Sequence, residues 1–454
     1  MTELSPSVPT PGIPQHIRET FRLALPVMLA RCGLVIMITV DTVMTGRAGS
    51  DQLAYYGIGY APQITMLTIG IGLLVGTVVL SAQAVGAGRP ELAGRIWRLG
   101  LLAAFVLGSA YGVALLFGEP MLLLMEQTPE MARAGGGVLF MWAIGMPGVL
   151  MYVATSSFLE GVSRPVPGMI VTLGANIVDI FLNWAMIYGH LGFPAMGAEG
   201  AVLSTSITRW LMFGALLFYV MRMEGHERFG VSLPLRGHYG QMRKLLLLGL
   251  PLALSIGFES SAFTAATTFA GWLGKASLAA YQVAINVNAV VFMLAIGIST
   301  ATAVRVANAV GRGDAVAVRR AGWVGTLLVV PTMLIATVFI LAMPEAIAAA
   351  YTDDALVIAI AVPLFAVTGW MVIVDGAQAV LLGAVRGAAD ITVPTVIYGV
   401  AFWALGVPLA YSFGFPMEAG VIGLVWGLFL SLIVAMLLLA WRFHVLSRRV
   451  IAPL

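Results

Sequence analysis

The stretch AVGAG at residues 84–88 recurs as AVGRG at residues 309–313, and the offset of 225 residues between the two copies decides the architecture. The same offset holds without a gap back to residue 25. The further matching pairs are Leu25-Pro26 with Leu250-Pro251, Leu53-Ala54 with Leu278-Ala279, and Ile71-Gly72 with Ile296-Gly297. Chance identities of small residues are common, but a fixed offset over such a length is not. The chain therefore consists of two related halves.

The composition excludes most classes of protein. Of the 454 residues, 60% are apolar and 10% are charged, whereas a soluble globular chain has about 45–50% and about 25%. So few charges cannot cover a water-exposed surface, which excludes a soluble enzyme, a disordered chain and a nucleic-acid-binding domain. The single cysteine, Cys32, excludes an intramolecular disulfide, a zinc cluster and an iron–sulfur site.

The chain contains twelve apolar runs, each long enough for a membrane-spanning helix of about 20 residues. They cover residues 20–45, 54–82, 97–118, 134–159, 167–189, 199–221, 245–272, 278–304, 321–343, 356–382, 391–414 and 419–441. We therefore predict an all-α integral membrane protein. Because each half holds six spans, both halves enter from the same side, as parallel repeats related by an axis along the membrane normal.

The repeat also predicts the domains. We expect a cytoplasmic segment at 1–19, an N-lobe at 20–221, a basic cytoplasmic linker at 222–244, a C-lobe at 245–441 and a cytoplasmic tail at 442–454. With the N-terminus in the cytoplasm, only three basic residues fall in outer loops, Arg47, Arg133 and Lys275. This is a strong positive-inside pattern, so we expect both termini to be cytoplasmic.

Four carboxylates lie inside the predicted spans: Asp41, Asp179, Glu259 and Asp375. A charge at the bilayer centre costs at least about 2.5–3.5 kcal/mol, so these groups must face water or a partner, or be protonated. Asp179 and Asn183 share one helix face. Such an oxygen-rich pair suits a hard cation, or it joins two helices by hydrogen bonds.

Two prolines and two arginines stand out in the same spans. Pro26 and Pro251 occupy equivalent positions in the first span of each half, where proline either provides a hinge or leaves a static kink. Arg31 and Arg209 are the only bases within the predicted spans, so each is expected to pair with an acid or to reach water. Tyr60 and Trp142 either stack on flat organic cations or pack against neighbouring helices.

Taken together, these features resemble the multidrug and toxic compound extrusion (MATE) family of cation-coupled antiporters, and in particular its NorM-type bacterial branch. The similarity covers about residues 15–445. It rests on Pro26 with DTVMTG at 41–46, on DIFLN at 179–183 with Ile187-Tyr188-Gly189, and on AYQVAIN at 280–286 continuing through Phe292-Met293 to Arg305-Val306.

The resemblance implies two pseudo-symmetric six-helix bundles that form a V around a central cavity. It implies a Na⁺ or H⁺ site in the N-lobe at Asp41, Asp179, Asn183 and Thr205, and a second such site in the C-lobe at Glu259 and Asp375. In the branch a neutral polar residue usually stands at Arg31, and a histidine is common at Tyr281. These two residues, with Gln282 and Asn286, are candidates for contacts to substrate or to the ion network.

The expected function is exchange of inward-moving Na⁺ or H⁺ for outward-moving organic cations, without a cofactor, by a monomer in the bacterial inner membrane. The alternative is a flippase for lipid-linked precursors from the same superfamily. A pyrophosphate-binding flippase needs a basic cavity, whereas the acids outnumber the bases in the predicted spans. A membrane enzyme is not expected, because the five histidines lie in predicted loops or termini and are not clustered.

Overall fold

The structure is a computed structural model that describes residues 13–231 and 239–448. The rest of the predicted N-terminal segment, linker and tail (1–12, 232–238 and 449–454) lies outside the described residues. The helices are α1 (Ile13–Ala48), α2 (Ser50–Leu74), α3 (Gly76–Gly86), α4 (Pro90–Leu115), α5 (Gly118–Leu124), α6 (Pro129–Gly161), α7 (Val166–Tyr188), α8 (Gly197–Arg222), η1 (His226–Phe229), α9 (Tyr239–Trp272), α10 (Lys275–Gly311), α11 (Ala315–Ala342), α12 (Pro344–Ala349), α13 (Ala355–Gly387), α14 (Thr392–Tyr398), the π-helical η2 (Gly399–Gly406), α15 (Val407–Gly414) and α16 (Gly420–Leu446).

The described residues contain twelve helical segments that are long and apolar enough to span a membrane and contain no strand, which confirms the predicted fold class. The second segment consists of α2 and α3, and the eleventh consists of α14, η2 and α15. The short helices α5 and α12 follow the third and ninth segments.

Several helices extend beyond the predicted spans, and this corrects the charge inventory. The extended helices include Glu160 at the end of α6, Arg305 in α10 and Arg386 in α13, while Arg98 lies inside α4. The prediction of four acids and two bases in the spans was therefore wrong. Hydropathy cannot show these groups, because a long side chain near a helix end keeps its apolar stem inside while its charged head reaches water or a partner.

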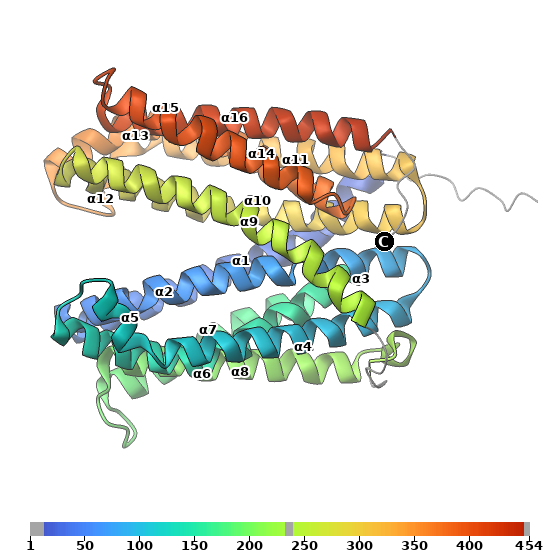
Figure 1. Ribbon diagram of the computed structural model, residues 1–454, viewed down its shortest axis with the longest axis horizontal. Helices are drawn as coiled ribbons and strands as arrows, with labels where there is room; N and C mark the ends of the chain where they lie inside the picture. The colour runs from blue at the N-terminus through green and yellow to red at the C-terminus, as the bar shows by residue number, and fades with distance from the viewer. Residues whose placement is uncertain (1–12, 232–238, 449–454) are drawn as a thin grey trace, which may run out of the picture.

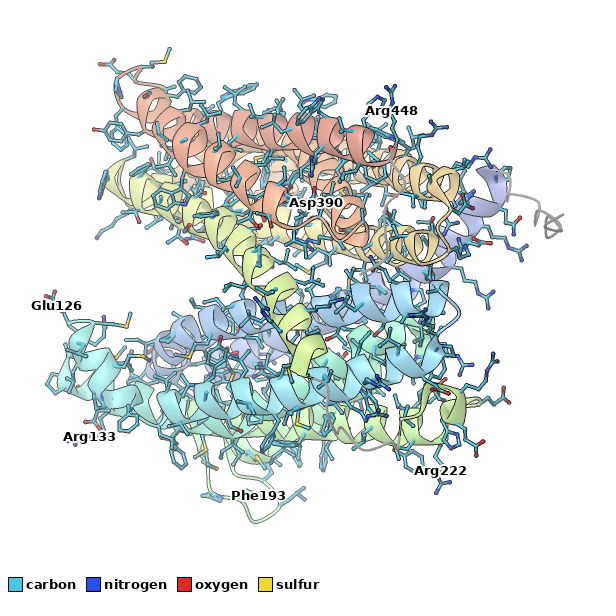
Figure 2. The ribbon with its side chains drawn as sticks, turned by 45° about the vertical axis from the view of Figure 1, so that its right-hand side comes forward. Glu126, Arg133, Phe193, Arg222, Asp390 and Arg448 are labelled. Atoms are coloured by element: carbon cyan, nitrogen blue, oxygen red, sulfur yellow. The ribbon has the colours of Figure 1, made fainter. Side chains whose placement is uncertain are left out.

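Figure 1 shows two bundles that converge at one end and diverge at the other, the predicted V arrangement. One bundle contains α2 to α8 and the other contains α10 to α16. The labelled Arg222 and Arg448 lie toward the converging end, whereas Glu126 and Arg133 lie at the diverging end (Figure 2). The converging end therefore carries the segments that we expect in the cytoplasm.

Helices α1 and α9 each pass from one bundle to the other. The first part of α1 packs against α10 of the C-lobe, and the rest packs against α7 and α8 of the N-lobe. The first part of α9 packs against α2 and α3, and the rest packs against α14, α15 and α16. Pro26 and Pro251 lie inside these helices, close to the crossings. This placement suits a hinge, and the role itself stays a prediction.

The repeated glycines form the contact between the two bundles. A Cβ at Gly86 would overlap the backbone of Asn308, and a Cβ at Gly311 would overlap the backbone of Gln83. Residues 83 and 308 are themselves 225 residues apart, so the two contacts are reciprocal. Gly72 against Ala253 and Gly297 against Met28 form a second reciprocal pair with the same offset. The sequence repeat is thus a structural repeat, with its two copies packed face to face.

We expect Gly311→Ala to destabilise the protein by about 1–3 kcal/mol, because the added methyl group has no space against residue 83. Gly86→Ala should act alike. Gly214→Ala on α8 is the matched control, since nothing lies within 4 Å of its Cβ and alanine favours a helix. Thermal unfolding in detergent measures the effect. An unchanged Tm in both interface variants would contradict this account of the contact.

Candidate functional site

Three helices, α1, α7 and α8, bring the predicted N-lobe residues together. The Asn183 Nδ2 atom donates to Asp41 Oδ1 at 2.7 Å and to Asp179 Oδ2 at 3.1 Å. The Thr205 hydroxyl donates to Asp41 Oδ2 at 2.8 Å. All four side chains are buried. They form one hydrogen-bonded cluster, and its use as an ion site stays a prediction.

The orientation of the Asn183 amide follows from this network. Its NH₂ group faces two carboxylate oxygens, which only accept hydrogen bonds, and its Oδ1 faces the hydroxyl of Ser204. Ser204 was not predicted, although it stands beside Thr205 in a run of three hydroxyl residues at 204–206. Asn183 therefore presents hydrogen-bond donors, not a metal-ligating oxygen, to both acids.

A buried guanidinium accompanies the two acids. Arg209 follows Thr205 by one turn of α8 and interacts electrostatically with Asp41 and Asp179. Its Cζ atom lies 4.3 Å from the centroid of the Trp142 ring, the geometry of a cation–π contact. The predicted pairing of Arg209 with an acid is thus through space, because no ion pair of Arg209 occurs in the described structure.

Several buried polar atoms of this region have no hydrogen-bond partner in the described structure. They are Asp179 Oδ1, Arg209 Nη1 and the hydroxyls of Thr45, Tyr56 and Thr208. Native proteins pair most buried polar atoms, so a group of unpaired ones marks a place where water or a small ion is favoured.

The C-lobe acids are also brought together. Glu259 on α9 and Asp375 on α13 interact electrostatically, and Arg386 is a charged neighbour of Glu259. Asn288 Nδ2 donates to Asp375 Oδ2 at 3.3 Å, and the Gln378 amide lies beside Glu259. Each lobe therefore combines two acids with an amide and an arginine.

Sequence reasoning missed Asn288, Gln378 and Arg386. Of the two asparagines in INVN at 285–288, the resemblance pointed to Asn286. In the structure Gln282 and Asn286 are exposed, and Asn286 donates only to the Gln282 carbonyl oxygen of its own helix. Tyr281 is buried and contacts the Phe263 carbonyl oxygen. Helical spacing from Tyr281 places 284 and 288 on the same buried face, a signal that could have identified Asn288.

Arg31 lies in a separate polar cluster between α1 and α6. Its guanidinium lies 3.8 Å from Glu160, which also accepts a hydrogen bond from Ser156. The pair lines a cavity of about 10 Å³ together with Tyr152, which is room for about one water molecule. The expected acid partner of Arg31 is thus Glu160, which the predicted span boundary had excluded.

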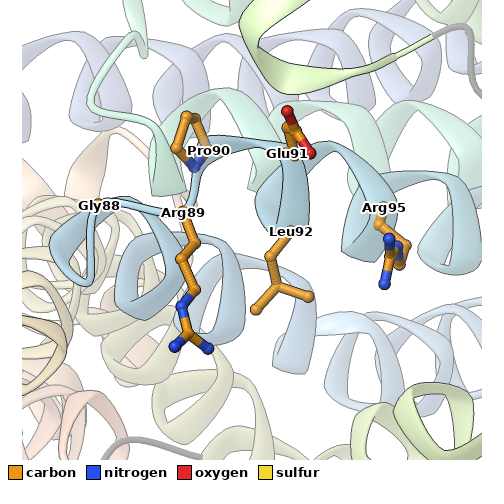
Figure 3. Close-up of a pocket in the computed structure, with 6 residues that line it drawn as sticks. All are labelled: Gly88, Arg89, Pro90, Glu91, Leu92 and Arg95. Atoms are coloured by element: carbon orange, nitrogen blue, oxygen red, sulfur yellow. The ribbon is translucent and has the colours of Figure 1, made fainter.

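A larger surface pocket of about 450 Å³ lies at the turn between α3 and α4. Figure 3 shows its lining by consecutive parts of one segment, including Arg89, Glu91 and Arg95. It contains none of the acids of either lobe, so it does not contribute to the candidate site.

Two buried acid clusters in two related six-helix halves define a membrane transporter with duplicated lobes. The MatE family model matches residues 26–185 and 251–412, so its two matches begin at Pro26 and Pro251, at the offset of the repeat. The chain belongs to the multidrug and toxic compound extrusion family, and it is therefore not an enzyme.

Its curated relatives are NorM proteins. The chain is 31% identical to a probable multidrug resistance protein NorM of Caulobacter vibrioides, over 99% of this chain and 95% of the relative. It is 34% identical to the multidrug resistance protein NorM of Burkholderia vietnamiensis, over 97% and 96% of the two chains. The match to NorM proteins confirms the predicted branch.

Solved structures share the fold. The eukaryotic MATE transporter AtDTX14 superposes with a TM-score of 0.88 at 18% identity, covering 96% of this chain and 98% of that one. An outward-facing multidrug resistance MATE family transporter of the MOP superfamily gives a TM-score of 0.87 at 19% identity, covering 97% and 99%.

We expect Asn183→Ala to lower stability by about 1.5–3 kcal/mol, because it removes the only donor to Asp41 Oδ1 and Asp179 Oδ2 seen in the described structure. Asn176→Ala is the matched control: Asn176 is buried on the same helix, but its amide donates only within α7. Chemical or thermal unfolding of both variants provides the comparison. Equal losses in the two would show that the bonds to the acids are not what holds this region.

Proposed function

We propose that the protein is a cation-coupled multidrug antiporter, which exports organic, mostly cationic compounds in exchange for Na⁺ or H⁺ by alternating access. The observation that carries this proposal is the burial of Asp41 with Asp179, and of Glu259 with Asp375, inside two symmetry-related lobes. Buried acids in a membrane protein mark ion or proton pathways. Relatives named multidrug resistance proteins supply the class of substrate.

In this mechanism the acids of both lobes are the coupling groups. Uptake of a cation or proton neutralises carboxylate charge, so a bound organic cation loses its attraction to the lobe. Asn183 and Thr205 position the N-lobe acids, and Pro26 and Pro251 act as hinges when α1 and α9 rearrange. The coupling is therefore a difference in affinity between two states of the same lobe.

The driving force is sufficient for useful export. One charge moving through 100 mV releases about 2.3 kcal/mol, and a tenfold concentration ratio requires about 1.4 kcal/mol. One coupling ion per cycle thus supports a gradient of a neutral solute of somewhat under about fiftyfold. We place the protein in the bacterial inner membrane as a monomer with both termini in the cytoplasm, where the proton or sodium gradient is directed inward.

The test uses purified protein in liposomes loaded with ethidium. A Na⁺ gradient and a pH gradient are imposed separately, with the membrane potential clamped. Drug movement under either gradient, with a drug-dependent flux of the same ion, is the expected result. If neither gradient moves the drug, the antiporter proposal is wrong, and lipid-linked substrates of a flippase become the next assay.

Replacement of one acid in each lobe should abolish gradient-driven transport. In Asp41→Asn and in Glu259→Gln the shape is retained, but the carboxylate that takes up the ion is lost. Asp390→Asn is the control, because this carboxylate pairs with Arg442 at 2.6 Å and belongs to neither cluster. Transport at the wild-type rate by Asp41→Asn or Glu259→Gln would refute the role of that residue.

A further inference from the structure

The N-lobe cluster carries its own positive charge. Arg209 is 8% exposed, and its charged neighbours are Asp41 and Asp179. One face of the guanidinium is covered by Trp142. A buried charge without a countercharge is strongly destabilising, so Arg209 has to be considered together with the two acids.

The charges around the acids come from five helices. Helix α1 contributes Asp41, α7 contributes Asp179 and α8 contributes Arg209. Helix α2 adds two tyrosines, Tyr56 and Tyr60, and α6 adds the uncharged Trp142. With both acids ionised the cluster has a net charge of −1, and one added proton makes it neutral.

The hydrogen bonds show where that proton would be held. Asp41 Oδ1 and Oδ2 and Asp179 Oδ2 each accept a hydrogen bond from Asn183 or Thr205. Asp179 Oδ1 is the remaining oxygen of the pair, and it is buried without a donor. The two carboxyl groups are close enough to share a hydrogen bond, as paired carboxyls with one proton do.

We propose that the N-lobe site takes up one proton, on Oδ1 of Asp179, with Arg209 as the fixed countercharge of the ionised Asp41, and that this site does not take up Na⁺. This inference rests on the proposed antiport function and specifies its ion. The proton is taken from water on one side of the membrane and forms an O–H bond on Asp179. It returns to water on the other side, and no other covalent bond changes.

The same atoms disfavour sodium. A hard cation needs several oxygen ligands, whereas the space between the two acids faces the NH₂ group of Asn183, whose amide oxygen is turned to Ser204. The guanidinium of Arg209 repels a second cation that carries no acceptor. A proton needs one free carboxylate oxygen, and the pair has one.

The test is the pH profile of drug transport in liposomes for wild type, Arg209→Met and Arg209→Lys. Loss of a neighbouring positive charge favours the protonated acid, so the profile of Arg209→Met should move to higher pH by at least about one unit. Arg209→Lys should restore the wild-type profile even where its rate falls. An unmoved profile in a folded Arg209→Met protein overturns the proposal.

Arg98→Met is the matched control for loss of an arginine whose Nε and Nη1 atoms are also buried without a partner. Its charged neighbour is Arg95 and it belongs to neither acid cluster, so its profile should not move. A shift equal to that of Arg209→Met would make the effect structural and overturn the assignment.

A second measurement needs no arginine variant. The Tm of wild type and of Asp41→Asn is compared in NaCl and in choline chloride at equal ionic strength. Any Na⁺-specific stabilisation should be the same in both proteins, because it then does not involve the N-lobe acids. A stabilisation by Na⁺ that Asp41→Asn loses overturns the proposal. Transport that only a Na⁺ gradient drives, through Asp41, has the same consequence while leaving the antiporter function intact.

Discussion

The close packing of Gly86 on residue 308, and of Gly311 on residue 83, is the contact on which the arrangement of both bundles depends. Neither pair of backbones could approach so closely if a side chain stood at the glycine. Lipid tails are as apolar as leucine, so membrane helices associate through tight packing of small residues rather than through a hydrophobic driving force. The converging end of the V is therefore set by backbone contact, and the bundles can diverge from there.

A second constraint acts inside each bundle. A buried charge has to meet donors or a countercharge, and this requirement explains why helices far apart in sequence meet at the acids. Asp41 is met by Asn183 and Thr205 from α7 and α8, and Asp375 is met by Asn288 from α10. The polar clusters thus fix the register of the helices that surround them.

The number of spans, the repeat and the acids could be predicted because each leaves a direct trace in sequence: apolar length, a constant offset, and charge in an apolar run. The partners of the acids could not. Asn288 rather than Asn286 contacts Asp375, because rotation of α10 about its axis decides which residue faces α13. Glu160 was missed for another reason: hydropathy ends a span at the first charge, while the helix continues to a partner, Arg31.

The two lobes repeat their mechanics but not their chemistry. Pro26 and Pro251 are equivalent, and so are the glycine contacts near them, yet Asp41 follows its proline by 15 residues and Glu259 follows its proline by eight. At about 1.5 Å per residue, these acids lie at depths of about 22 Å and about 12 Å beyond the two crossings. Each crossing helix therefore carries a lobe contact and an acid on one continuous element, the kind of physical link that coupling between sites requires. Because the two acids lie at different depths, charge changes in the two lobes act on the shared contact over different lengths of helix. A duplicated transporter can in this way respond to two ionisation events with one symmetric interface.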